Sequence, residues 1–201
     1  MSLPPSNDDS TTDNRLVIIA NPTAGVGAVG AGRQDRRRII EAAHHDLERS
    51  GFAVDVQMEA DPEGVSTLAE TAVREGLRRV VAAGGDGTVN AVVNGIMRAT
   101  RAHPAQSKGV ALGVLPIGTG NVFAFNMGIT AHWRDACRII RAGHLRCIDV
   151  GVARSTAPGM RGQQRRYFLL MAGIGYDAKV IEDTSLRLKY VLRDFAYVLK
   201  T

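Results

Sequence analysis

Short apolar runs rich in β-branched residues alternate with amphipathic segments along most of this chain, and this alternation constrains the fold more than any other feature. The expected strands cover residues 16–20, 52–58, 77–83 and 108–115, and the expected helices cover residues 32–50, 64–76 and 89–99. Strands that alternate with helices of this length form βαβ units, in which the strands pair in parallel. The sequence therefore predicts a three-layer α/β/α domain with a parallel sheet over residues 15–130.

The pattern changes after an amphipathic segment at residues 133–142. Residues 144–153 and 165–171 alternate like strands, and a loop at residues 154–164 joins them without a helix. Residues 179–201 are expected to be helical or irregular, so too few strands follow to complete a sheet. We expect residues 131–201 to hold a linking helix and the incomplete start of an antiparallel β domain.

The N-terminal residues 1–14 are rich in Ser, Pro, Asp and Thr. Such a composition buries too little apolar surface to offset the entropy of ordering, so we expect a disordered leader. No apolar core of a signal peptide and no run of eighteen apolar residues occurs. Cys137 and Cys147 have no metal-ligand spacing and suit free thiols in a reducing compartment, which predicts a cytoplasmic protein.

The chain carries 25 basic and 20 acidic side chains, a net charge of +5. This balance favours anionic partners such as nucleotide phosphates or a phospholipid surface. Aromatic residues make up 5% of the chain and do not interleave with basic ones, which argues against a nucleic-acid partner. The five histidines show no spacing typical of a metal site, and the sequence alone identifies no metal ligands.

The sequence GGDGTVN at residues 84–90 lies between an expected strand and an expected helix. Glycines allow the backbone to approach a ligand closely, and a helix N-terminus attracts phosphate. Asp86 adds a carboxylate that could hold Mg²⁺ or a nucleotide hydroxyl, and Thr88 could cap the helix or bind phosphate. The candidate nucleotide-binding residues of this loop are Gly84, Gly85, Asp86, Gly87, Thr88 and Asn90.

Two further loops follow strands of the same expected sheet. GTGN at residues 118–121 repeats the arrangement one strand along, and NPTAG at residues 21–25 follows the first strand. Ligands of parallel sheets bind beyond the carboxyl ends of the strands, so these loops are expected to face one crevice. The candidate nucleotide-binding residues added by these loops are Asn21, Gly25, Gly118, Thr119 and Asn121.

The loop after the first strand also allows an alternative interpretation as a dinucleotide-binding motif. Gly25, Gly27 and Gly30 match G-x-G-x-x-G, and Glu59 at the end of the second strand is a candidate ribose-binding acid. Residues 21–24 nevertheless separate the strand from the first glycine, and this reading leaves GGDGT unexplained. A flexible glycine-rich loop is the preferred interpretation.

Four segments in this order resemble the catalytic domain of the diacylglycerol kinase family, which includes bacterial lipid kinases and sphingosine kinases. They are NPTAG (21–25), GGDGTVNAVVNGI (84–96), LPIGTGNVFAFNMGI (115–129) and AGIGYDA (172–178). The resemblance implies a two-domain kinase, with an N-terminal α/β domain and a C-terminal β-sandwich. ATP and a lipid meet in the cleft between the two domains in such an enzyme.

The resemblance also implies roles for individual residues. It assigns ATP phosphate contacts to residues 84–88 and Asn90, and it places Asn21, Gly25, Thr119 and Asn121 near the nucleotide. Asp86 is the catalytic candidate within this chain, ATP and Mg²⁺ are the expected cofactors, and the expected acceptor is a lipid such as diacylglycerol. Contact with the membrane is then transient and peripheral.

Several positions depart from the family pattern. Val122 stands where many members have Asp, and Glu59 and Ala60 stand where many have threonine. The resemblance implies that the general base and residues of a magnesium site come from a later part of the C-terminal domain, and we expect no matching segment within these 201 residues. Asp177 is expected to help hold the two domains together.

Three alternatives stay open on the sequence alone. An NAD kinase-like phosphotransferase would also use GGDGT, a dehydrogenase would bind NAD without needing Asp86, and a shortened chain would bind nucleotide without transferring phosphate. An incomplete β domain exposes unpaired strand edges, so self-association into a homo-oligomer is also expected.

Overall fold

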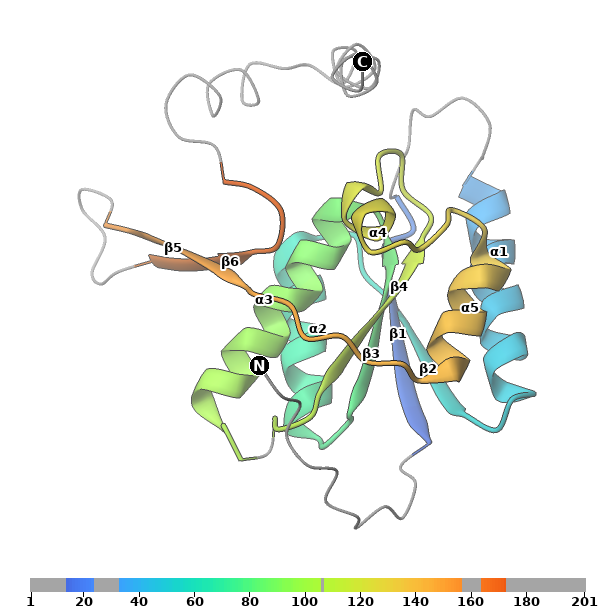
Figure 1. Ribbon diagram of the computed structural model, residues 1–201, viewed down its shortest axis with the longest axis horizontal. Helices are drawn as coiled ribbons and strands as arrows, with labels where there is room; N and C mark the ends of the chain where they lie inside the picture. The colour runs from blue at the N-terminus through green and yellow to red at the C-terminus, as the bar shows by residue number, and fades with distance from the viewer. Residues whose placement is uncertain (1–13, 24–32, 106, 157–163, 173–201) are drawn as a thin grey trace.

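The computed structural model describes residues 14–23, 33–105, 107–156 and 164–172 of the 201-residue chain (Figure 1). The leader at residues 1–13, the glycines at 25, 27 and 30, the segment 179–201 and Asp177 lie outside the described residues. The predictions made for them stay predictions.

Four parallel strands form the central sheet, as the sequence predicts. They are β1 (Arg15–Ala20), β2 (Ala53–Met58), β3 (Arg79–Gly84) and β4 (Ala111–Pro116). The order is β2-β1-β3-β4, with Val17 opposite Val80 in one pair of strands and Val81 opposite Gly113 in the next. The chain runs outward from β1 to β2 and then returns to the other side of β1, so the direction of winding reverses between β1 and β3.

Helices cover both faces of this sheet (Figure 1). Pro62–Arg74 (α2) and Asp86–Ala102 (α3) pack together on one face, whereas Arg33–Glu48 (α1) and Trp133–Ala142 (α5) pack on the other. Val17 and Ile19 of β1 point toward the first pair, and Leu16 and Ile18 point toward the second. Because both faces of the strand are buried, its sequence is continuously apolar. The three-layer architecture is confirmed.

The predicted boundaries of the helices and strands are close to the observed ones, with one informative difference. Helix α3 begins at Asp86, three residues before the predicted start at Val89. Gly85 occupies the N-cap in an extended conformation, and an aspartate in the first turn suits the helix dipole. The GGDGT sequence is therefore half loop and half helix.

After α5 the structure has an antiparallel pair of strands, Gly151–Ser155 (β5) and Gln164–Phe168 (β6), and a β domain that begins with this pair stays a prediction. The predicted strand at residues 144–153 is wrong for residues 144–150, which are mostly exposed and form no strand. These residues pair with no described strand, so alternation alone does not make them a strand. Among the residues that the structure describes, no helix is both long and apolar enough to span a lipid bilayer.

Candidate functional site

Three loops meet at the carboxyl ends of the central strands, where the winding of the sheet reverses. The backbone N–H of Asn21, after β1, donates to the carbonyl of Ala83 at 3.0 Å. The N–H of Ile117, after β4, donates to the carbonyl of Gly84 at 3.2 Å. Ligands of open parallel sheets bind at such reversal points. The described parts of the loops that the sequence singled out therefore lie at one edge of the sheet, and a nucleotide crevice between them stays a prediction.

The two glycine-rich loops touch through their backbones. A Cβ atom added to Gly118 would lie 2.3 Å from the Cα atom of Gly85 and 2.7 Å from its nitrogen. A Cβ atom added to Gly85 would lie 3.3 Å from the Cα atom of Gly118. Any side chain at residue 118 would therefore force the loops apart, and the two loops form one continuous backbone surface.

The Asp86 carboxylate links the same two loops. Its Oδ2 atom accepts a hydrogen bond from the backbone N–H of Val122 at 3.0 Å, and its Oδ1 atom accepts one from Phe123 at 2.8 Å. These are the first two N–H groups of the short helix α4 (Val122–Asn126). Asp86 thus caps α4 from another element. A carboxylate has about four acceptor positions, so both oxygens can still take a further partner.

The side chain of Asn121 holds its own loop. Its Oδ1 atom accepts from the N–H of Gly118 at 3.1 Å, and its Nδ2 atom donates to the carbonyl of Gly118 at 2.9 Å. Its backbone is left-handed, with φ of 52°, a conformation that asparagine tolerates better than most residues. The amide therefore shapes the loop, while Thr119 and Gly120 are exposed at the tip.

Thr88 does not cap α3, contrary to one of the two roles predicted for it. It lies inside the first turn, behind the N-cap Gly85, and its side chain is buried. A Cβ atom added to Gly84 would lie 2.2 Å from Thr88 Oγ1, so Gly84 leaves the space in which this threonine packs. Gly87 and Asn90, in contrast, are exposed. Contacts of these residues with phosphate stay predictions.

The loop after β1 begins with an asparagine turn. Asn21 Oδ1 accepts from both the N–H and the hydroxyl of Thr23, each at 2.8 Å. The nearby Glu59 accepts from the N–H groups of Ala60 and Asp61 at 2.7 and 2.9 Å, so its carboxylate organises the start of α2. These bonds order the chain just after β1 and just after β2.

A pocket of about 230 Å³ adjoins the glycine loops. Asp86 and Asn90 supply its polar lining, and the rest is mainly apolar. The complete lining is Asp86, Val89, Asn90, Phe123, Phe168, Leu169, Leu170 and Met171. Since residues 168–171 end and follow β6, the pocket lies between the end of β6 and helices α3 and α4. It places an apolar surface beside the carboxylate of Asp86.

Asn94 of α3 anchors β6 at this pocket. Its Oδ1 atom accepts from the N–H of Tyr167 and its Nδ2 atom donates to the carbonyl of Tyr167, both at 2.9 Å. The side-chain amide thus forms the two hydrogen bonds that the backbone of a neighbouring strand would form with Tyr167. Asn94 is only 3% exposed. Sequence reasoning did not assign Asn94 a role, although it lies within the 84–96 motif.

Three charged side chains at the surface add to the contact between α3 and β6. Arg98 of α3 donates to both oxygens of Glu63 on α2, and Arg166 of β6 lies 3.6 Å from Glu63. The hydrogen bond from Arg98 holds the pKa of Glu63 below its usual value, although partial burial acts in the opposite direction. The three side chains connect α2, α3 and β6.

Comparisons with known proteins agree with this arrangement. Residues 15–153 match the family described as the diacylglycerol kinase catalytic domain. A diacylglycerol kinase of Staphylococcus carnosus is 30% identical over 92% of this chain and 53% of its own length. A diacylglycerol kinase of Staphylococcus aureus is 33% identical over 92% of this chain and 51% of its own length. The chain thus spans about half the length of the curated relatives it matches.

A solved structure shows the same fold. The crystal structure of a diacylglycerol kinase from Bacillus anthracis superposes with a TM-score of 0.56 at 20% identity. The superposition covers 72% of this chain and 49% of the other chain. With the family match covering most of the sequence, and with the loops and sheet in this geometry, the chain belongs to the diacylglycerol kinase catalytic domain family.

Proposed function

We propose that this chain is the nucleotide-binding part of an ATP-dependent lipid kinase that transfers the γ-phosphate of ATP to a lipid hydroxyl, such as that of diacylglycerol. The observation that carries the proposal is the backbone contact between Gly85 and Gly118, with Asp86 between this contact and an apolar pocket. One continuous surface then faces both a phosphate chain and a lipid.

The phosphates would lie against the two glycine loops. The first turn of α3 begins at Asp86 and contains the exposed Gly87, and the first N–H groups of a helix have no carbonyl partner within the helix. The helix dipole adds positive potential at the same place. Gly84, Gly85, Gly118 and Thr119 complete this surface, and Asn21, Gly25 and Asn121 are proposed to shape it.

Mg²⁺ would enter with the nucleotide. No group of three or more His, Cys, Asp or Glu side chains lies at the loops in the described part of the chain, but Asp86 supplies one carboxylate with acceptor capacity left. One or two carboxylates combined with phosphate oxygens and water is the usual environment of Mg²⁺ in kinases. The ion would neutralise phosphate charge during transfer.

The reaction requires the lipid hydroxyl oxygen to attack the γ-phosphorus while the bond to the bridging oxygen of ADP breaks. Asp86 is proposed as the catalytic candidate, and its place in the lining of the pocket, next to the contact between the glycine loops, supports this role. The base that takes the hydroxyl proton is expected in a later part of the C-terminal domain, as the family resemblance implies. Catalysis by the loops themselves is then positioning and charge stabilisation.

The acceptor would bind through apolar contacts. Phe123, Phe168 and Leu169 line the pocket, and the exposed side chains of Phe125 and Met171 lie close to its lining in the sequence. Exposed apolar side chains of this kind favour contact with a membrane surface, and the exposed Arg166 adds attraction for anionic headgroups. A cytoplasmic protein that visits the membrane transiently is therefore proposed. Self-association through the edges of β5 and β6 stays a prediction.

The test is transfer from γ-labelled ATP to a panel containing diacylglycerol, other lipid alcohols and NAD. Wild-type protein, Asp86→Ala and Asp61→Ala would be compared, since Asp61 caps α2 by accepting from Gly64 and lies outside the loops. Labelled lipid from wild type and Asp61→Ala, but not from Asp86→Ala, would support the proposal. Labelled NAD alone would identify an NAD kinase-like enzyme instead.

Nucleotide binding would be measured on the same proteins by calorimetry. ATP binding without transfer would assign this chain as a nucleotide-binding part that needs further residues for catalysis. Failure of wild type to bind ATP in the presence of Mg²⁺ would refute the proposed role of the glycine loops.

A further inference from the structure

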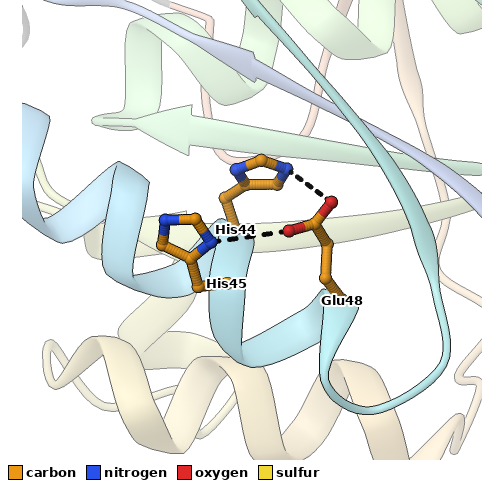
Figure 2. Close-up of side chains that lie close together, drawn as sticks. All are labelled: His44, His45 and Glu48. Atoms are coloured by element: carbon orange, nitrogen blue, oxygen red, sulfur yellow. Dashed lines mark ion pairs between the residues drawn. The ribbon is translucent and has the colours of Figure 1, made fainter.

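Two histidines and a glutamate converge on the last turn of α1. The Nε2 atom of His44 lies 3.2 Å from Oε1 of Glu48, and the Nδ1 atom of His45 lies 3.5 Å from Oε2 (Figure 2). One ligand atom from each of the three side chains can be chosen so that all lie within 4.8 Å of one another. Each oxygen of one carboxylate therefore faces a different imidazole.

Helix geometry explains the convergence. Residues four and three positions apart lie on one helix face, so both His44 and His45 reach Glu48 from the preceding turn. The two imidazole rings are stacked, with centroids 5.2 Å apart and planes inclined by 25°. Figure 2 shows both dashed contacts ending on the single carboxylate of Glu48.

The ligand set selects the class of ion. Imidazole nitrogen with one carboxylate suits Zn²⁺, Cu²⁺ or Ni²⁺, whereas Mg²⁺ and Ca²⁺ prefer oxygen ligands. Zinc binds histidine nitrogen at roughly 2.0–2.1 Å, which puts tetrahedral ligand atoms about 3.4 Å apart. The side chains of His44, His45 and Glu48 are 28%, 69% and 45% exposed, so small rotations can close this distance.

The surrounding structure favours a cation at this place. The C-terminal end of a helix carries negative potential, and Glu48 is the last residue of α1. Gly51, with φ of 92°, lies in the turn that follows the helix, and its N–H donates to the carbonyl of Glu48 at 2.9 Å, which holds the turn in position. Asp46 is engaged by Arg141 and Arg49, so it leaves the histidines and Glu48 as the available ligands.

The cluster is remote from the glycine loops. The end of α1 lies beside the starts of β1 and β2, where the N–H of Ala53 donates to the carbonyl of Asn14. The glycine loops follow the opposite ends of these parallel strands. An ion bound at the cluster is therefore distinct from the Mg²⁺ that accompanies a nucleotide.

We propose that His44, His45 and Glu48 bind one divalent transition-metal ion, with Zn²⁺ as the reference ion. Three protein ligands leave a fourth position for water. The ion joins two successive turns at the end of α1, so it stabilises the folded chain in proportion to its occupancy.

The test uses the tag-free, full-length chain, stripped of metal with a chelator and titrated with ZnCl₂ by calorimetry in excess Mg²⁺. One equivalent of Zn²⁺ is expected to bind and to raise the thermal unfolding temperature. His44→Ala, His45→Ala and Glu48→Gln are each expected to weaken the affinity at least tenfold. His144→Ala, an exposed histidine outside the cluster, is the matched control and is expected to bind like wild type.

The proposal would be overturned if the wild type did not bind one equivalent of Zn²⁺. It would also be overturned if His144→Ala and His44→Ala lost the same amount of Zn²⁺ affinity. Unchanged affinity in His45→Ala would also overturn it, because the site would then lack its third ligand. ATP affinity serves as a separate readout. It is expected to be unchanged in all four variants, so failure of the metal site and failure of the nucleotide site remain distinguishable.

Discussion

The Oδ1 atom of Asp86 accepts a 2.8 Å hydrogen bond from the backbone N–H of Phe123, 37 residues further along the chain. The first residue of α3 thereby caps α4, and the same carboxylate lines the pocket beside the glycine loops. A residue singled out for chemistry thus also holds together the loops that would bind the nucleotide. Its substitution is expected to affect stability and binding together.

Asp86→Ala is predicted to lower the free energy of unfolding by about 2 kcal/mol, because two hydrogen bonds to a charged acceptor are lost. Urea unfolding followed by circular dichroism would measure this. ATP affinity is predicted to fall at least tenfold, since the loops separate and a potential Mg²⁺ ligand disappears. Asp61→Ala provides the comparison: loss of this N-cap costs about 1 kcal/mol and leaves ATP affinity unchanged. Equal ATP affinity in the two variants would contradict the role of Asp86.

Gly118→Ala tests the contact between the loops without changing a charge. The new Cβ atom would lie 2.3 Å from the Cα atom of Gly85, so the backbone must move. ATP affinity measured by calorimetry is predicted to fall at least tenfold. Gly109→Asn is the control, because Gly109 has open space around it and a positive φ that asparagine tolerates. If Gly118→Ala binds ATP like wild type, the loops do not bind phosphate as one surface.

The sequence predicts the layers of this fold because the apolar patterns of its strands and of its helices are both local. Strand β1 is a continuous apolar run since both of its faces are covered, and α2 buries one side at every third or fourth residue. The start of α3 was misplaced for a local reason as well. Glycines disfavour helix interiors, yet Gly87 lies in the first turn, where Asp86 and the Gly85 cap favour the helix.

What the sequence does not reveal depends on contacts between distant residues. Nothing near Asp86 in the sequence indicates that α4 will supply its hydrogen-bond donors, and nothing near Asn94 indicates Tyr167. The segment 144–150 alternates like a strand, but a strand requires a neighbour, and that requirement cannot be seen in alternation. The spacing of the histidines alone does not indicate the cluster of His44, His45 and Glu48, because its third member is a glutamate and a charged residue at the end of a helix is common at a solvated surface.

Asn94→Ala is predicted to loosen β6 rather than unfold the α/β domain. The substitution leaves the N–H and carbonyl of Tyr167 without their partner, at a cost of roughly 1–3 kcal/mol for a buried group left unsatisfied. Hydrogen exchange of the Tyr167 amide is predicted to accelerate at least tenfold, while amides of β1 and β3 keep their protection. Asn126→Ala, at an exposed position of α4, is the control and is expected to leave amide exchange unchanged both at Tyr167 and in β1 and β3. Unchanged exchange at Tyr167 would show that Asn94 does not anchor the strand.

The ion pair between Glu63 and Arg98 predicts a pH dependence whose sign follows from the pKa of Glu63. The hydrogen bond from Arg98 lowers this pKa below the ordinary value of 4.5, so folding favours the ionised carboxylate. The resulting stability is present above the pKa of the unfolded chain and is lost as the pH falls through the lower pKa of the folded chain. Because the Glu63 side chain is 55% exposed, solvent screening limits its contribution to about 0.5 kcal/mol.

Glu63→Gln is therefore predicted to be less stable than wild type by about 0.5 kcal/mol near pH 7, and this deficit is predicted to be smaller near pH 3. Urea unfolding at both pH values measures the difference, with Glu41→Gln on the exposed face of α1 as the matched substitution. A deficit of the same size at both pH values would mean that the ionised carboxylate is not the stabilising species. Arg166 of β6 also faces Glu63, so the loss of stability near pH 7 should be accompanied by faster amide exchange in β6. Faster exchange in β6 would show that Glu63 links α2, α3 and β6. Unchanged exchange in β6 would show that the ion pair affects the two helices alone.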